Sequence, residues 1–220
     1  AQFKLPIETP KAAAISLSAL PPLTVQENAA AINIAGGNFQ LSFDKLLGTI
    51  SSWTCHGLAL LTAGPRLNVW RAPTDNDVHI AREWRNFGFD RLQHRINAVE
   101  IVKSQSAAVQ IAVSSRLAPY GVSPRFDCEY IYTIYGSGDI TIETKVTPLG
   151  ELPVLPRLGL QLTMPDGFTQ FSWYGRGPHE SYIDRKESAY VGVFKGTVEE
   201  QYVPYIFPQE NGNKSDVRWA

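Results

Sequence analysis

The sequence predicts an all-β fold, an antiparallel β-sandwich, from three observations. Apolar and polar residues alternate through residues 109–113, 126–134, 140–146 and 158–164, which is typical of strands that bury one face. Turn-forming sequences such as 136–139 separate these stretches. No helical pattern of crossover length lies between them, so consecutive strands are expected to pair antiparallel. We therefore expect a four-stranded meander that forms part of a sandwich.

The residues before this meander predict a hairpin, further short strands and one short helix. Residues 31–34 and 39–43 flank the turn sequence Gly36-Gly37-Asn38 and indicate a β-hairpin. Residues 81–90 predict a helix, with Trp84 and Phe87 on one face and Gly88 where a helix would end. Further short apolar strands are expected at residues 49–53, 58–61 and 67–70. Residues 1–23 contain prolines and no sustained period, which is typical of a linker or an edge strand.

Composition excludes several classes of protein. The chain has 220 residues, of which 44% are hydrophobic and 11% aromatic, so it can bury a sizeable core. Its 20 basic and 21 acidic residues give a net charge of -1, which argues against binding nucleic acid or an anionic membrane. It has no apolar run of about 18 residues, the length that predicts a membrane span. Cys55 and Cys128 form no CxxC pair, which argues against a disulfide scaffold or a zinc site and favours a reducing cytoplasm.

A dense polar stretch at residues 70–77 is the first candidate for function. Asp75, Asn76 and Asp77 follow a proline, and such side chains can cap their own backbone amides and reach a nearby arginine such as Arg71. One interpretation is a hydrogen-bonded corner that joins strands. A second is that the corner directs the next loop toward a substrate; this loop is Val78, His79, Ile80 and Ala81. A metal site at Asp75 and Asp77 is disfavoured, because no Asp-rich calcium loop follows.

A second dense stretch, residues 173–185, combines aromatic, glycine and charged residues. Gly175, Gly177 and Pro178 are expected to end a strand over 168–174 and to let the backbone pass close to another element. The charged residues can brace a long loop through ion pairs. Alternatively they line a sugar-binding groove in which Trp173 or Tyr174 stacks on a pyranose ring. The candidates for this groove or bracing network are Arg71, Asp75, Asn76, Asp77, Arg157, Trp173, Arg176, His179, Glu180, Asp184, Arg185, Glu210 and Asn211.

Four blocks of sequence, in order, resemble one family. Residues 70–77, 157–160, 173–185 and 202–212 are similar to the C-terminal domain of the large bacterial β-galactosidases of glycoside hydrolase family 2. Residues 24–69 match more weakly. The resemblance implies a supersandwich like that of galactose mutarotase over residues 24–220, incomplete at its C-terminal end. It also implies that residues 1–23 are a linker and the end of a preceding immunoglobulin-like domain.

The resemblance implies a non-catalytic role for this region. The family's catalytic glutamates lie at strand ends of a TIM barrel, and no βα repeat occurs here to build one. We therefore assign no catalytic residue and no metal ligand in this chain. In the family the loop after the Asp-Asn-Asp triplet reaches the mouth of the barrel and moves; the corresponding residues 78–81 look shorter and lack the family's glutamate. The alternative function is a free-standing carbohydrate-binding or aldose-1-epimerase-like domain that uses His179 and Glu210 as acid and base.

Partners and cofactors are expected to follow from the same resemblance. The remaining domains of a β-galactosidase and a galactoside substrate are the expected partners, within a homo-oligomeric bacterial enzyme of the cytoplasm. No cofactor is expected in this chain, whereas the parent enzyme is expected to depend on Mg²⁺ and Na⁺.

Overall fold

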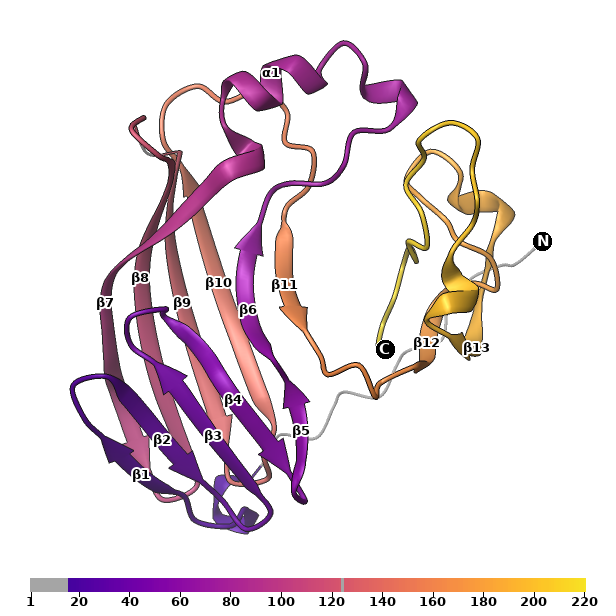
Figure 1. The fold of residues 1–220 in the computed structure, drawn as a ribbon. Helices are drawn as coiled ribbons and strands as arrows, with labels where there is room; N and C mark the ends of the chain where they lie inside the picture. The colour runs from indigo at the N-terminus through magenta and orange to yellow at the C-terminus, as the bar shows by residue number, and fades with distance from the viewer. Residues whose placement is uncertain (1–15, 124) are drawn as a thin grey trace. The chain divides into compact units, whose positions relative to one another are not determined.

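The computed structural model describes residues 16–123 and 125–220, and antiparallel strands dominate this part of the chain (Figure 1). Two compact units are present. We call residues 16–71 and 79–165 the sandwich unit, and residues 72–78 and 166–220 the small unit. The predicted linker falls largely in residues 1–15, outside the described residues.

The described residues of the sandwich unit form eleven strands and one α-helix. These are β1 (Thr24–Glu27), β2 (Ala31–Ala35), β3 (Phe39–Asp44), β4 (Thr49–Cys55), β5 (Leu58–Leu61), β6 (Ala63–Asn68), α1 (Ala81–Asn86), β7 (Leu92–Gln105), β8 (Ala108–Pro119), β9 (Phe126–Tyr135), β10 (Ile140–Pro148) and β11 (Gly159–Thr163). Short 3₁₀ turns cover Leu17–Ala19 and Phe89–Arg91.

Two antiparallel sheets form the layers of the sandwich. One has the order β1-β2-β3-β4-β5 and the other the order β10-β9-β8-β7, while β11 pairs with β6. The strands β1 to β4 lie in front of the sheet of β7 to β10 in Figure 1. The two sheets share one apolar core, where Phe43 of β3 meets Tyr132 of β9 edge to face with ring centroids 4.9 Å apart. The predicted all-β antiparallel sandwich is confirmed.

Alternation along the central strands explains this packing. In β8, Val109, Ile111 and Val113 are buried while their neighbours are more exposed. Successive side chains of a strand point to opposite faces, so this period of two places one face of the sheet against the partner sheet. The hairpin of β2 and β3 is also confirmed, since Ile34 pairs with Leu41.

Two details of the predicted meander are wrong. The fourth strand of the sheet is β7, which the sequence pattern did not indicate. It is an edge strand with two register shifts, and its inward positions include the polar His94. Conversely, β11 does not join the meander, because the chain leaves that sheet after β10 and β11 pairs with β6 in a separate two-stranded sheet.

A strand predicted at residues 67–70 is displaced toward the N-terminus. The strand β6 ends at Asn68, whose side chain accepts a hydrogen bond from the backbone N–H of Trp70 at 2.9 Å and donates one to its carbonyl oxygen at 2.9 Å. These local bonds replace the sheet pairing of Trp70 and end the strand. The predicted helix at 81–90 is confirmed in a shorter form: α1 is followed by Gly88, whose φ of 75° is left-handed.

The small unit is built on the hairpin of β12 (Gln170–Gly177) and β13 (Tyr190–Thr197), with 3₁₀ turns at Asp75–Asp77, Lys186–Ser188 and Glu199–Gln201. Gly175 lies inside β12, so the expectation that it breaks the strand is wrong. The expected close approach is present, because a Cβ atom at Gly175 would lie 2.9 Å from the Cα of Val217. The C-terminal segment runs beside β12 there, where the Tyr174 N–H donates to the Trp219 carbonyl oxygen at 2.9 Å.

Cys55 and Cys128 are both free thiols, so no disulfide joins the sheets. Within the part of the chain that the structure describes, no helix has the length and apolar character needed to cross a bilayer.

Candidate functional site

The predicted site residues divide between the two units. Arg71, Arg157 and residues 79–81 belong to the sandwich unit. The remaining candidates belong to the small unit, where two loops and the C-terminal segment bring most of them into hydrogen-bonded networks.

The Asp-Asn-Asp corner of the small unit is a capped 3₁₀ turn. Asp77 is 9% exposed, and its carboxylate accepts hydrogen bonds from the backbone N–H of Thr74 at 2.7 Å and from the Thr74 hydroxyl at 3.0 Å. Residues 208–209 also hold the corner, because the Asp75 N–H donates to the Pro208 carbonyl oxygen at 2.9 Å and Gln209 donates to the Asp75 carboxylate at 2.9 Å. The expectation that these side chains cap their own backbone is confirmed.

The predicted substrate-facing loop is one residue shorter than expected. Val78, His79 and Ile80 form a turn, and Val78 is 69% exposed. Ala81 is the first residue of α1 and is buried, so it offers no surface to a substrate.

Glu180 and Arg185 form the centre of a partly buried network in the connection between β12 and β13. The Glu180 side chain is 4% exposed; one carboxylate oxygen accepts from the Arg185 guanidinium at 2.9 Å and the other from the Gly212 N–H at 2.6 Å. Arg185 also donates to the Tyr205 hydroxyl at 2.7 Å and the Glu210 carbonyl oxygen at 2.7 Å. Two charged side chains thereby join the connection to residues 205–212.

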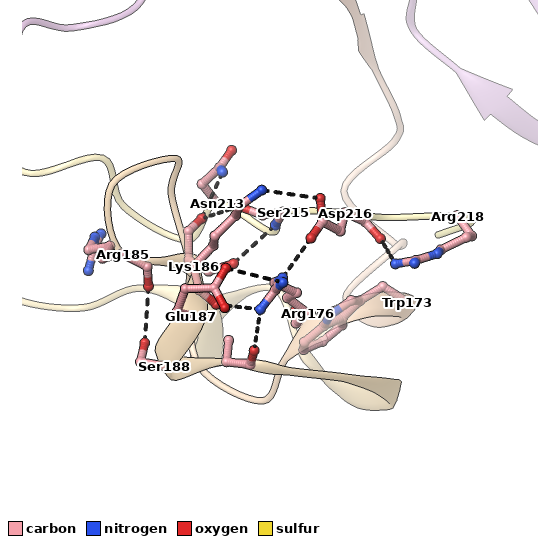
Figure 2. A network of polar contacts seen from close by, with 12 residues as sticks. Trp173, Arg176, Arg185, Lys186, Glu187, Ser188, Asn213, Ser215, Asp216 and Arg218 are labelled. Carbon is pink, nitrogen blue, oxygen red and sulfur yellow. Dashed lines mark hydrogen bonds and ion pairs between the residues drawn. The ribbon is translucent and has the colours of Figure 1, made fainter. Parts of the chain in front are cut away.

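Arg176 forms a second network at the end of β12, shown in Figure 2. Its guanidinium donates to the Asp216 carboxylate at 2.6 Å and to the carbonyl oxygens of Lys186 and Ala189, each at 2.9 Å. The hydrogen bond from Arg176 holds the pKa of the Asp216 carboxyl below its ordinary value. Asp216 is not among the predicted site residues, because nothing in the local sequence around it marks a partner 40 residues after Arg176.

The two aromatic candidates differ in access. Trp173 is 1% exposed, with the Phe171 ring stacked on it at 5.1 Å and the Lys214 amine 4.7 Å from its ring centroid. It therefore has no free face, and the suggestion that Trp173 stacks on a sugar is wrong. Tyr174 points the other way and is 37% exposed, with the Arg218 guanidinium 5.5 Å from its ring centroid.

The remaining candidates of the small unit lie nearer the surface. The His179 ring shares a 3.0 Å hydrogen bond with the Ser188 hydroxyl, and Asp184 is exposed. Asn211 bonds through its side-chain amide to both backbone groups of Val203. These bonds order residues 203–211, which form an irregular segment.

In the sandwich unit, Arg71 belongs to an aromatic cluster beside α1. Its guanidinium lies 5.4 Å from the Trp84 ring centroid and donates to the Pro156 carbonyl oxygen at 3.1 Å. The Trp84 indole N–H donates to the Val154 carbonyl oxygen at 2.7 Å, and the Trp70 ring meets the Trp84 ring edge to face. This cluster fixes residues 154–156 against α1, and Arg157 follows it at the surface.

The side chains in these networks are hydrogen-bonded mainly to the backbone of other segments, so they hold the segments in place and leave few groups available to react. Among the described residues the two buried carboxylates, Asp77 and Glu180, both accept hydrogen bonds from backbone N–H groups, so each one fixes a segment of the chain. In the residues that the structure covers, no group of three or more His, Cys, Asp or Glu side chains is arranged to hold a metal ion.

Comparison with known proteins gives a consistent result. Residues 35–220 match the family model described as beta galactosidase small chain. The chain is 38% identical over 225 residues to a beta-galactosidase of Priestia megaterium, covering 100% of this chain and 21% of that protein. It is 30% identical to a beta-galactosidase of Kluyveromyces lactis (99% of this chain, 22% of that protein) and 36% identical to one of Lactobacillus delbrueckii subsp. bulgaricus (86% and 18%). The chain thus spans about a fifth of the length of these curated relatives.

Proposed function

The chain belongs to the beta galactosidase small chain family, and from this premise we propose that it is a non-catalytic domain of a β-galactosidase that hydrolyses terminal β-D-galactosides. The observation that carries this proposal is the match of residues 35–220 to the family model, together with the similarity of the chain to beta-galactosidases of which it covers about a fifth. In this proposal the catalytic carboxylates lie in the other parts of the enzyme, and this chain shapes the mouth of their active site.

The condition of the acidic side chains supports a non-catalytic role. A retaining glycosidase needs two carboxyl groups about 5 Å apart, one of them with a raised pKa. Here both oxygens of Glu180 are bound, by Arg185 and by the Gly212 N–H, and the pKa of Asp216 is lowered by Arg176. A carboxyl group whose pKa is lowered, as that of Asp216 is, is a poor proton donor, and the Glu180 carboxylate has no oxygen without a partner.

Exposed residues beside the rigid corner support a role in contacting other parts of the enzyme. The capped turn at Asp75–Asp77 is hydrogen-bonded to residues 208–209, and Val78 directly follows this fixed turn. Ile206 is 94% exposed and Phe207 is 69% exposed, and both directly precede residues 208–209, which hold the turn. Large apolar side chains at these levels of exposure are suited to contacts with the remaining domains of the enzyme.

Hydrolysis of a chromogenic β-galactoside tests the proposal. The 220-residue chain should release no product alone, whereas mixing it with a β-galactosidase that lacks this domain should restore turnover. A variant that carries Glu180→Ala should restore less, since the Gly212 N–H and the Arg185 guanidinium lose their acceptor. Turnover by the chain alone would overturn the proposal.

Polarimetry separates this function from the epimerase alternative. The proposed domain should leave the rate at which α-galactose reaches its anomeric equilibrium unchanged from that of buffer. Acceleration by the chain that disappears in a Glu210→Gln variant would establish the alternative.

A further inference from the structure

A pocket in the sandwich unit is independent of the proposed contacts of the small unit. It has a volume of about 370 Å³ and lies among β6, β11 and the start of β7. Its apolar wall includes Trp70 and Phe89, and its polar lining includes Arg66, His94 and Gln161. Small-molecule sites combine apolar walls with a few convergent polar groups in this way, and occupy roughly 300 to 1,000 Å³.

Strand pairing brings these polar groups together from distant parts of the sequence. Arg66 of β6 and Gln161 of β11 are directly paired, so their side chains share one face of this two-stranded ladder. His94 reaches the same pocket from β7, and lies close enough to Arg66 for the guanidinium charge to affect it.

The charge of Arg66 is the feature that points to a ligand. Arg66 is half-buried, and among the described residues no carboxylate lies within ion-pair distance of its guanidinium. Asp90 also lines the pocket, but its carboxylate is 2.9 Å from the Arg91 guanidinium, which balances its charge. A guanidinium that is partly desolvated without a counter-ion attracts an oxyanion, for which its planar donors are suited.

His94 adds a donor or acceptor without adding a second charge. Burial, followed by the nearby Arg66 charge, lowers the pKa of the His94 ring below its ordinary value. A neutral imidazole can hydrogen-bond an oxygen of a ligand, as can the Gln161 amide.

We propose that this pocket binds a small oxyanion of monosaccharide size, a sugar carboxylate or a sugar phosphate, with Arg66 pairing with the anionic group and Trp70 contacting the apolar face of the ring. The carboxylate and the phosphate share the chemistry that Arg66 recognises. A neutral sugar of the same shape lacks this anionic group.

Isothermal titration calorimetry on the 220-residue chain tests this site with three matched probes: D-galacturonate, D-galactose 6-phosphate and D-galactose. We expect one or both charged probes to bind at least about tenfold more tightly than galactose, because charge-assisted hydrogen bonds are about twice as strong as neutral ones. Preference between the two charged probes identifies whether carboxylate or phosphate is the better ligand. Equal affinity for all three, or no heat of binding with any of them, would overturn the proposal.

Arg66→Gln should weaken binding of the charged probe at least about tenfold and leave the weak binding of galactose unchanged. Arg95→Gln is the matched control, since Arg95 is an exposed arginine next to His94 in β7. If Arg66→Gln does not fold by circular dichroism, Gln161→Ala replaces it, with a smaller loss of affinity expected. Equal losses in the Arg66 or Gln161 variant and in Arg95→Gln would assign the effect to general charge and overturn the site.

Discussion

The sandwich unit and the small unit are stabilised by different interactions. In the sandwich unit the buried side chains are overwhelmingly apolar and form one cluster shared by two sheets. In the small unit the buried side chains of the described residues include Asp77, Glu180 and Ser181 beside Trp173 and Ala189. A small hydrophobic core supplies little burial energy, so hydrogen bonds to charged groups carry more of the small unit's stability.

This difference predicts that the stability of the two units responds differently to substitutions and to pH. Apolar packing responds to loss of volume and little to pH, whereas networks of charged groups respond to loss of a partner and to protonation. Four substitutions, two in each unit, test the contrast.

The largest effect is expected from Phe43→Ala in the sandwich unit. Phe43 is 0% exposed and packs edge to face on Tyr132, so the substitution removes a large side chain from the centre of the core. Such a cavity costs about 3 to 5 kcal/mol in the free energy of unfolding. Urea unfolding followed by circular dichroism should show it. Leu47→Ala is the control, because Leu47 is 44% exposed and should change little; equal effects of the two variants would contradict the assignment of the core.

The next effect is expected from Glu180→Ala in the small unit. Removing this carboxylate leaves the Gly212 N–H and the Arg185 guanidinium without an acceptor, which costs about 2 kcal/mol. Hydrogen exchange of the Gly212 amide should accelerate about 30-fold, as this energy implies. Glu187→Ala is the control, since the Glu187 side chain is 82% exposed and lies 3.5 Å from Arg176. Unchanged exchange at Gly212 in Glu180→Ala would show that other contacts hold the segment.

The strands of the sandwich unit show why its fold could be predicted from the sequence, except at one edge. In β8 and β9 the alternation of apolar residues is a local pattern with one physical solution, a strand buried on one face. In β7 the pattern is weaker, because His94 takes an inward position and two bulges shift the register. Local periodicity therefore identified the central strands β8 and β9 and missed the edge strand β7.

The candidate site shows the same limit. The density of charges around Glu180 indicated ion pairs that brace a loop, and one such pair joins Glu180 to Arg185, although the sequence did not indicate which charges would pair. The other partner of Glu180 is a backbone amide 32 residues away, and the partner of Arg176 lies 40 residues away. Such pairings depend on where the C-terminal segment returns beside β12, which no local sequence pattern records.

The third prediction concerns the pH dependence of the small unit. The pKa of Asp216 is lowered from 3.8 by its hydrogen bond to Arg176. A carboxyl whose folded pKa is lowered stabilises the folded state above its unfolded pKa, and that stabilisation is lost as the pH falls through the folded pKa. Protection of the Arg176 amide, which donates to the Ser215 carbonyl oxygen, should therefore be constant above about pH 5 and fall below about pH 4.

Two variants isolate the contribution of Asp216. Asp216→Asn should remove most of this pH dependence from the Arg176 amide and lower its protection at neutral pH. Asp127→Asn is the matched control: the pKa of Asp127 is likewise lowered, by Arg116, but this pair joins neighbouring strands of the sandwich unit. A pH profile in Asp216→Asn that equals that of the unsubstituted protein would show that another acid controls the segment.

The smallest effect is expected from Lys145→Ala in the sandwich unit. Lys145 of β10 forms a 3.1 Å ion pair with Glu129 of β9, but the two side chains are 72% and 63% exposed. Water screens such a pair, and these two residues already face each other through the sheet register. The free energy of unfolding, from urea titration, should therefore change by less than about 0.5 kcal/mol. A loss as large as that of Glu180→Ala would mean that surface charges stabilise both units alike, because burial and hydrogen bonds to the backbone set the Glu180–Arg185 pair apart from the Glu129–Lys145 pair.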